Sequence, residues 1–194
     1  MTEISSLCVF CGSKMGADEA YADAARALGR EIAQRGVNLV YGGGGIGIMG
    51  ILAHTVLAEG GTVTGVIPHF IMELEVGDPG LTELILVDNM HDRKRKMFEL
   101  SDGFITLPGG LGTLDETFEI ITWKQLRQHS KPIVVLNAGG YWDPFKGMVE
   151  KIIDQDFAHA AAAELFTVVD TPAEVFPALA DAPEPQDVVL TDHL

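Results

Sequence analysis

Residues 108–116 bring glycines, a threonine and two carboxylates together in a spacing that could bind a phosphate and act on the group attached to it. They read Pro-Gly-Gly-Leu-Gly-Thr-Leu-Asp-Glu and separate an apolar run, residues 103–107, from a helical segment. Glycine lets the backbone approach an anion closely, a helix N-terminus offers unpaired N–H groups with partial positive charge, and Thr113 adds a hydroxyl donor. The spacing therefore predicts a phosphate site at residues 109–113, which we call the phosphate seat.

The second carboxylate of this segment, Glu116, is expected to meet a different part of the same ligand, because a glutamate facing a phosphate would repel it. At about 100° per residue, Glu116 falls on one side of the helix with three other side chains, those of Thr113, Ile120 and Trp123. A carboxylate in such an apolar stripe rarely lacks a task or a partner, and a sugar ring is the group that fits. The alternative is that the turn only reverses the chain and that its acids are ordinary partners of the helix dipole.

Residues 91–97, His-Asp-Arg-Lys-Arg-Lys-Met, form the densest positive cluster of the chain. A solvated helix face is the ordinary explanation for such a run. However, Met90 and Met97 share one apolar line on this helix, and Arg93 and Lys94 flank that line. An arginine on an apolar stripe must find an anionic or strongly accepting partner, and its planar fork suits a phosphate or a carboxylate. Arg93 is therefore the cation that we expect in the site.

Composition favours one globular domain. The chain has 194 residues, of which 47% are hydrophobic and 21% charged, enough for one well-filled core. Its formal net charge of −15 disfavours nucleic acid and anionic membranes as partners. No basic segment precedes a long apolar run and no stretch has the length of a membrane span, so we expect a cytoplasmic protein. Residues 1–181 should form a single nucleotide-binding domain, and residues 182–194, with prolines and scattered acids, a loose tail.

Apolar strand-like runs alternate with helical segments along the chain, which is typical of a parallel sheet covered on both sides. Strands are predicted at residues 4–11, 37–41, 62–67, 84–87, 103–107, 133–136 and 166–169. A helix over residues 18–35 should end at Gly36, and residues 171–174 combine a capping threonine, a proline at N1 and a glutamate at N3. The predicted fold class is α/β, a doubly wound, Rossmann-like and mostly parallel sheet of about seven strands with helices on both faces.

Ligands of such sheets bind beyond the carboxyl ends of the strands, where three glycine-bearing loops are expected: Gly12 with Ser13, residues 42–50, and the phosphate seat. The loop at 42–50 contains G-x-G-x-x-G twice. A dinucleotide site remains a weak alternative, because that fingerprint follows the first strand of a unit and needs an acid at the tip of the next strand. A Walker A loop is excluded, since no Gly-Lys-Ser or Gly-Lys-Thr follows. We expect Gly43 and Gly44 to let the chain pass close under a sugar or base.

Two cysteines, Cys8 and Cys11, have C-x-x-C spacing but lie in the first predicted strand, where residues three apart point to opposite faces. Zinc would need two more ligands of similar quality, and a redox motif belongs at a helix start. Buried, reduced thiols are the favoured interpretation. The six histidines form no H-x-x-x-H cluster, so we expect no metal. We expect no cofactor either.

The motifs together resemble those of the LOG ("Lonely Guy") family of cytokinin riboside 5′-monophosphate phosphoribohydrolases. Over residues 7–141 the chain carries the family's V-F-C-G-S at 9–13, Y-G-G-G-x-x-G-x-M-G at 41–50, V-I-P at 66–68, M-H-x-R-K-x-x-M at 90–97, P-G-G-x-G-T-x-x-E at 108–116 and I-T-W-x-Q-L at 121–126. Beyond Tyr141 the resemblance fades. One departure is Asp115, where plant members usually carry glutamate.

This resemblance implies that Arg93 and Glu116 are the catalytic pair. The expected substrate contacts are Gly12, Ser13, Gly43, Gly44, Glu75, Met90, Lys94, Gly109, Gly110, Leu111, Gly112, Thr113, Asp115 and Thr122. It also implies a homodimer, and a reaction that releases adenine-type base and ribose 5-phosphate from a cytokinin nucleotide or AMP. A carboxylate beside C1′ would stabilise the oxocarbenium-like sugar of that reaction.

Two other functions are weighed against this reaction. Sequences of this type have been labelled lysine decarboxylases, but pyridoxal chemistry needs a Schiff-base lysine and an acid on the pyridine nitrogen, for which the site offers no sign beyond Lys94. The alternative from a different class is a carrier that binds a nucleotide-like or molybdenum-cofactor-like phosphate on the same fold without turning it over. A carrier needs the phosphate seat but not the buried acid, so Arg93 together with Glu116 distinguishes the two.

Overall fold

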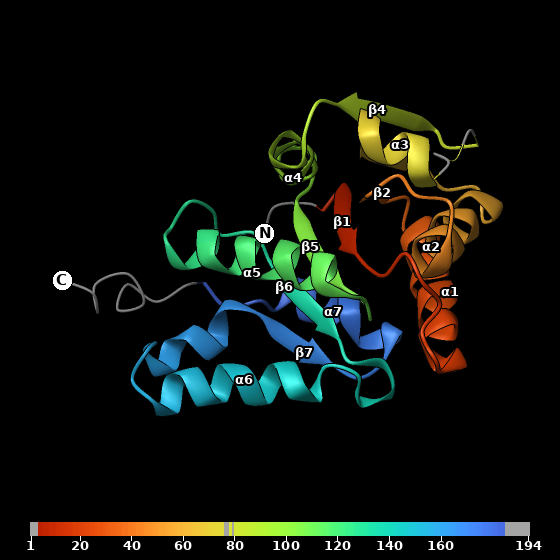
Figure 1. Ribbon diagram of the computed structural model, residues 1–194. Coiled ribbons are helices and arrows are strands. Elements are labelled where there is room, and N and C mark those ends of the chain that lie inside the picture. The colour runs from red at the N-terminus through yellow and green to blue at the C-terminus, as the bar shows by residue number, and fades with distance from the viewer. Residues whose placement is uncertain (1–3, 76–77, 79, 185–194) are drawn as a thin grey trace.

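The computed structural model describes residues 4–75, 78 and 80–184, and its centre is a parallel sheet of seven strands (Figure 1). The strands lie in the order β4-β3-β2-β1-β5-β6-β7, and every neighbouring pair is parallel. Their bounds are β1 Ser6–Phe10, β2 Asn38–Tyr41, β3 Val63–Pro68, β4 Glu83–Val87, β5 Gly103–Thr106, β6 Ile133–Leu136 and β7 Thr167–Val169. The predicted strands are confirmed, with ends that differ by no more than two residues.

Helices cover both faces of this sheet, as predicted (Figure 1). One face packs against α1 (Glu19–Gln34), α2 (Gly47–Ala58) and α7 (Val175–Ala180), and the other against α4 (Met90–Glu99), α5 (Leu111–Gln125) and α6 (Asp143–Asp154). The described chain also holds α3 (His69–Glu75) and the short 3₁₀ turns η1 (Ala138–Gly140), η2 (Ala160–Leu165) and η3 (Pro172–Glu174). The doubly wound, Rossmann-like fold class is therefore confirmed.

Side chains alternate between the two faces along β1. Leu7 and Val9 belong to the core beneath α1 and α2, whereas Cys8 and Phe10 belong to the core beneath α4 and α5. Cys11 lies in the first of these cores, so the two cysteines point to opposite faces and are free, buried thiols. Burial raises the pKa of both thiols, which keeps them protonated.

Local sequence signals set the ends of α1. The carboxylate of Asp18 accepts a hydrogen bond from Ala20 N at 2.9 Å as the N-cap, and Gly36 has a φ of +67° directly after the C-cap. Thr171 and Glu174 also form the predicted capping box, although the turn that they begin is the short η3, which leads into α7.

The sheet order reverses between β1 and β5, which is where a ligand site is expected in a fold of this kind. The chain leaves β1 towards β2 on one side and leaves β5 towards β6 on the other, so the loops after β1 and β5 diverge and leave a crevice. Gly12 N donates a hydrogen bond to Pro108 O at 3.1 Å, and this bond joins the two loops at the edge of the sheet. The fold thus places Gly12 beside the phosphate seat.

After α7, residues 182–184 form neither helix nor strand, and the rest of the predicted tail, 185–194, lies outside the described residues. Among the helices that the structure describes, none combines the length and the apolar character needed to cross a membrane.

Candidate active site

A cavity of about 500 Å³ opens at the carboxyl ends of β1 and β5. Its walls come from the loops after β1, β2, β5 and β6, from the first turns of α1, α2 and α5, and from α4. The residues of this lining that bear on the chemistry are Gly12, Ser13, Gly42, Arg93, Glu116 and the phosphate seat. Sequence segments as far apart as Val9 and Tyr141 therefore meet at one site.

The phosphate seat presents unpaired backbone donors to this cavity. Gly110 is the N-cap of α5, no side chain caps the helix, and the first helical hydrogen bond runs from Leu114 N to Gly110 O at 3.1 Å. Among the described residues, the N–H groups of 110–113 have no acceptor. At Gly109 a Cβ would lie 2.1 Å from Thr113 Oγ1, so only glycine allows the turn to close this tightly. All five seat residues line the cavity, where these N–H groups could bind an anion.

Glu116 lies one helical turn beyond the seat and is 9% exposed. The stripe predicted around it is present, since Thr113 and Ile120 are buried and Trp123 is half-buried. Burial raises the pKa of Glu116 to about 7, although the nearby Arg93 guanidinium opposes the shift. At neutral pH the carboxyl group therefore exists in both its protonated and its ionised form, as acid–base chemistry requires.

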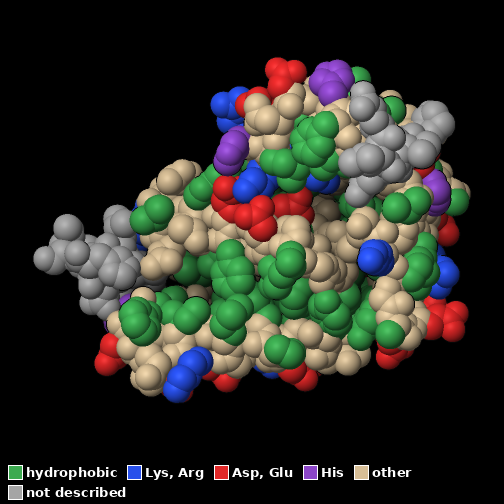
Figure 2. All heavy atoms as spheres, viewed as in Figure 1, with side chains coloured by type: hydrophobic (Ala, Val, Ile, Leu, Met, Phe, Trp, Pro, Cys, Tyr) green, Lys and Arg blue, Asp and Glu red, His purple; other side chains and the backbone are tan. Residues whose placement is uncertain are grey.

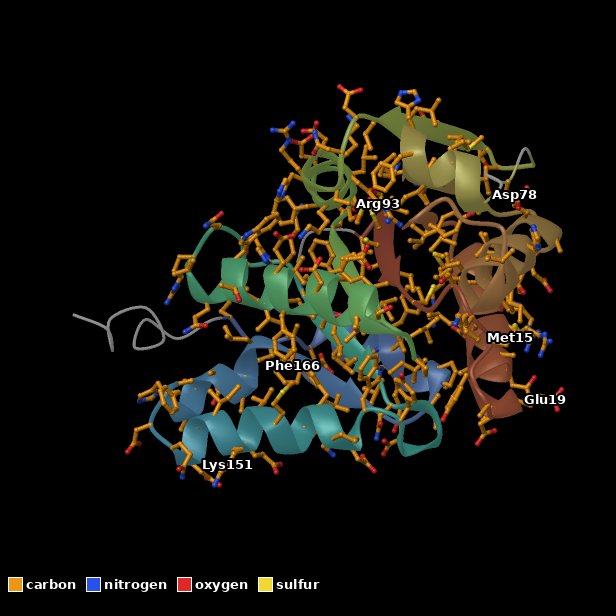
Figure 3. The ribbon with its side chains drawn as sticks, viewed as in Figure 1. Met15, Glu19, Asp78, Arg93, Lys151 and Phe166 are labelled. Atoms are coloured by element: carbon orange, nitrogen blue, oxygen red, sulfur yellow. The ribbon has the colours of Figure 1, made fainter. Side chains whose placement is uncertain are left out.

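Arg93 projects from α4 towards the ends of β2 and β3 and is 8% exposed (Figure 3). Its Nε donates to Val66 O and its Nη2 donates to Gly42 O, both at 3.1 Å. Within the described residues no carboxylate lies within 4.0 Å of it, so two backbone carbonyls and the Met90 sulfur hold the guanidinium. A buried cation held in this way keeps its charge available for an anionic or polar ligand in the cavity.

Lys94, the neighbour of Arg93, is paired with carboxylates instead. Its Nζ lies 3.1 Å from Asp115 Oδ2 and 3.1 Å from Glu119 Oε1. Burial alone would lower the pKa of Lys94, but hydrogen bonds to Glu119 and Asp115 outweigh burial and raise it. Figure 2 shows acidic side chains gathered between α4 and α5 beside a basic one. Lys94 and Asp115 thus lie together, beside the cavity lining rather than in it.

Other predicted contacts also lie outside the lining. Gly43 and Gly44 are buried, and Gly43 has a φ of +78° and packs against Ile67, so this stretch faces β3 instead of the cavity. Met90 contacts Arg93 Nη1 through its sulfur at 3.8 Å, and Thr122 is exposed on α5. Glu75 ends α3, and its side chain lies outside the described residues.

The structure adds residues that the motifs did not single out. Gly42 lines the cavity, and a Cβ there would lie 2.0 Å from Arg93 Nη2, so glycine at this position makes room for the guanidinium. Lys14, Met15, Tyr21 and Tyr141 also line it. The available signal for Gly42 was its place as the first of four consecutive glycines, and for Tyr141 a Gly-Gly-Tyr-Trp sequence after a predicted strand.

Fold and site together define a Rossmann-like α/β protein with a cavity lined, among the described residues, by unpaired backbone N–H groups at the switch point of its sheet. The sequence profile of a family described as "Possible lysine decarboxylase" matches residues 49–179, further along the chain than the motifs extend. The chain is 43% identical over 169 residues to the cytokinin riboside 5′-monophosphate phosphoribohydrolase LOG of Oryza sativa subsp. japonica, covering 87% of this chain and 68% of that protein. It is 44% identical over 160 residues to the cytokinin riboside 5′-monophosphate phosphoribohydrolase LOG5 of Arabidopsis thaliana, covering 82% and 70%. The chain therefore belongs to the LOG family of phosphoribohydrolases, and it is an enzyme of the N-glycosyl hydrolase class.

Among solved structures, the chain is similar to the Moco carrier protein from Chlamydomonas reinhardtii, with a TM-score of 0.69 and 22% identity over 93% of this chain and 98% of that one. At this identity the likeness concerns the fold alone.

Proposed function

We propose that this protein hydrolyses the N-glycosidic bond of adenine-type nucleoside 5′-monophosphates, with cytokinin riboside 5′-monophosphates as the preferred class and AMP as a further substrate. The observation that carries the proposal is the buried carboxyl group of Glu116, with a pKa of about 7, one helical turn beyond the phosphate seat. This spacing suits a nucleotide whose phosphate and anomeric carbon are separated by a few bonds.

The proposed reaction divides binding and bond cleavage between the two parts of the site. The seat holds the 5′-phosphate through its N–H groups, and Gly12 and Ser13 border it. Binding energy gained at the phosphate, remote from the reacting bond, holds C1′ against the carboxyl group. The bond from C1′ to the base nitrogen breaks with its electron pair passing to the base, and water adds its oxygen to C1′ and supplies the proton that the base gains.

Glu116 acts on the sugar in this scheme. In its ionised form it stabilises the positive charge that develops on the ring and orients the attacking water. Arg93 contacts the nucleotide or orients this carboxylate, since its guanidinium already favours the ionised form of Glu116. Family resemblance alone supports seven further proposed substrate contacts, which are Gly43, Gly44, Glu75, Met90, Lys94, Asp115 and Thr122.

Lysine decarboxylation is not supported by the state of Lys94. A Schiff base forms from a neutral amine, whereas two carboxylates hold Lys94 in its charged form and raise its pKa. The structure thus favours sugar chemistry at Glu116 over pyridoxal chemistry at Lys94.

Release of free base from AMP and from isopentenyladenosine monophosphate tests the proposal. Glu116→Ala should abolish release while nucleotide binding persists, and the matched variant Glu150→Ala, which removes a carboxylate on α6 outside the cavity lining, should leave release unchanged. Full activity of Glu116→Ala would remove that residue from the mechanism. Nucleotide binding without any turnover by the natural protein would favour the carrier function instead.

We further propose that the protein acts as a homodimer in the cytoplasm, with residues 1–181 as one nucleotide-binding domain. Figure 2 shows hydrophobic side chains gathered across the face formed by α5 and α6. Large apolar side chains exposed on or next to these helices include Leu126, Met148, Ile152 and Phe157, the last of them 79% exposed. An apolar patch of this kind fits a second copy of the chain. Light scattering should give twice the mass of one chain, and Ile152→Asp should reduce it to one chain.

A further inference from the structure

Tyr141 contacts the phosphate seat although the site motifs assign it no role. Its hydroxyl donates a hydrogen bond to Gly109 O at 2.5 Å, from a position directly after η1. Gly109 is the first residue of the seat, and 32 residues of chain separate it from Tyr141. The side chain of Tyr141 also lines the cavity.

The hydrogen bond to Gly109 O bears on the direction of the next N–H group. In a trans peptide the C=O of one residue and the N–H of the next point in opposite directions. Holding Gly109 O towards Tyr141 therefore directs Gly110 N–H away from Tyr141, and the bond from Gly12 N to Pro108 O holds the preceding peptide in the same way. Without such bonds the two successive glycines could rotate these peptide planes at little cost.

Tyr141 is itself held firmly by the loop that carries it. The buried side chain of Asn137, at the end of β6, accepts a hydrogen bond from Trp142 N at 2.6 Å and donates to Asp143 Oδ1 at 2.9 Å. Gly139 and Gly140 have φ values of +61° and +74°, which lets η1 turn sharply beneath Tyr141. Hydrogen bonds from Asn137 to Trp142 and Asp143 thus close the short turn that carries Tyr141.

Aromatic packing extends this support to the loop after β1. The rings of Tyr21 and Tyr141 meet edge to face with centroids 5.2 Å apart. Gly16 lies against Tyr21 as well, where a Cβ would come within 2.7 Å of the ring. Tyr141 and Tyr21 therefore join three loops that line the cavity, namely the loops after β1, β5 and β6.

We propose that Tyr141 is a positioning residue for the phosphate group of the substrate: its hydroxyl orients the Gly110 N–H of the phosphate seat by holding Gly109 O. The inference rests on the proposed function for the identity of the ligand, but it concerns recognition of phosphate and not bond cleavage. Tyr141 does not touch the reacting atoms. Loss of its hydroxyl should therefore weaken the binding of ligands that carry a phosphate and leave the binding of ligands without one unchanged.

Tyr141→Phe tests this role because it removes the hydroxyl and keeps the ring. Loss of one hydrogen bond of this kind should weaken binding of AMP and of ribose 5-phosphate roughly threefold to tenfold, measured by calorimetry. Binding of adenosine should stay unchanged, and in turnover KM for AMP should rise while kcat changes less than about twofold. Thr55→Val is the matched control, because it removes a hydroxyl that donates to Ile51 O at 2.7 Å on α2, away from the cavity.

Equal losses with AMP and adenosine, or unchanged affinity for ribose 5-phosphate, would overturn the inference. Repeating the calorimetry in the Glu116→Ala background separates the two proposals. A loss of phosphate affinity there supports the role of Tyr141 even if the natural protein releases no base. Hydrolysis by the natural protein with full phosphate affinity in Tyr141→Phe would contradict only the role of Tyr141.

Discussion

Two glycine-rich loops border the cavity, and they use glycine for different physical reasons. The first is residues 42–50, the loop after β2 with the first turn of α2, which we call the packing loop. Its glycines serve packing: a Cβ at Gly50 would lie 2.3 Å from Gly45 O, and one at Gly42 would displace Arg93. In the phosphate seat, a Cβ added at Gly110 or Gly112 would meet nothing within 4 Å, and neither residue has a positive φ. The packing loop therefore needs glycine to fold and to hold the cation, whereas the seat needs it for packing only at Gly109 and otherwise keeps glycine where a ligand would lie.

Two neighbouring cations on α4, Arg93 and Lys94, also differ in the groups that hold them. Arg93 is held by carbonyls of β3 and the packing loop, and no described carboxylate pairs with it, while Lys94 is neutralised by Asp115 and Glu119. Adjacent residues on one helix thus acquire different chemistry, because one points to the sheet edge and the other to α5. Of the two, Arg93 is the one that brings its positive charge to the cavity.

The largest effect is expected from Gly42→Ala. The added methyl group would lie 2.0 Å from Arg93 Nη2, so the guanidinium must shift from the place where two carbonyls hold it. Displacing a site group by about 1 Å can cost roughly 100-fold in rate, and we expect kcat/KM for AMP to fall by at least that factor. Gly147→Ala, where a Cβ meets nothing within 4 Å, is the control. Full activity of Gly42→Ala would show that Arg93 need not stay in place.

Gly50→Ala should mainly lower stability. Its Cβ would clash with backbone atoms of Gly45, which cannot move aside as a flexible side chain could. Overpacking of this kind costs about 3 kcal/mol of unfolding free energy, which urea denaturation would measure. A stability equal to that of the natural protein would contradict a packing role for this loop.

Ionisation of Glu116 should make stability depend on pH. Its pKa rises from 4.5 to about 7 in the folded protein, so the folded state binds more protons than the unfolded state between these values. The carboxyl group therefore destabilises the fold as pH rises through this window, by about 2 kcal/mol between pH 5 and pH 8. Urea denaturation of Glu116→Gln at both pH values should show that this part of the pH dependence has gone. An unchanged pH dependence would mean that another group is responsible.

The smallest effect on folding is expected from Gly112→Ala in the seat. Alanine is favoured over glycine in a helix by about 0.5–1 kcal/mol, so unfolding free energy should stay equal or rise slightly. Affinity for AMP should fall severalfold, because the methyl group enters the space where the backbone meets the ligand. A loss of stability like that of Gly50→Ala would remove the contrast between the two loops.

Much of the fold was predictable because its signals are local. The cap at Asp18, the positive φ at Gly36 and the alternation along β1 each depend on residues close in sequence. The burial of Glu116 was also predictable, since helical periodicity alone places it in an apolar stripe. The room that Gly42 leaves for Arg93 was not, because a clash between residues 51 positions apart has no signature in either segment.

The sequence by itself determined the parallel α/β architecture, the glycine turn at the start of α5 and the buried position of its carboxylate, since hydrophobic periodicity and backbone preferences act over a few residues. Only the tertiary structure decided that Lys94 pairs with Asp115 and Glu119, that Gly42 makes room for Arg93, and that Tyr141 reaches Gly109. Those contacts follow from the order in which the strands assemble, which brings distant loops to one edge of the sheet.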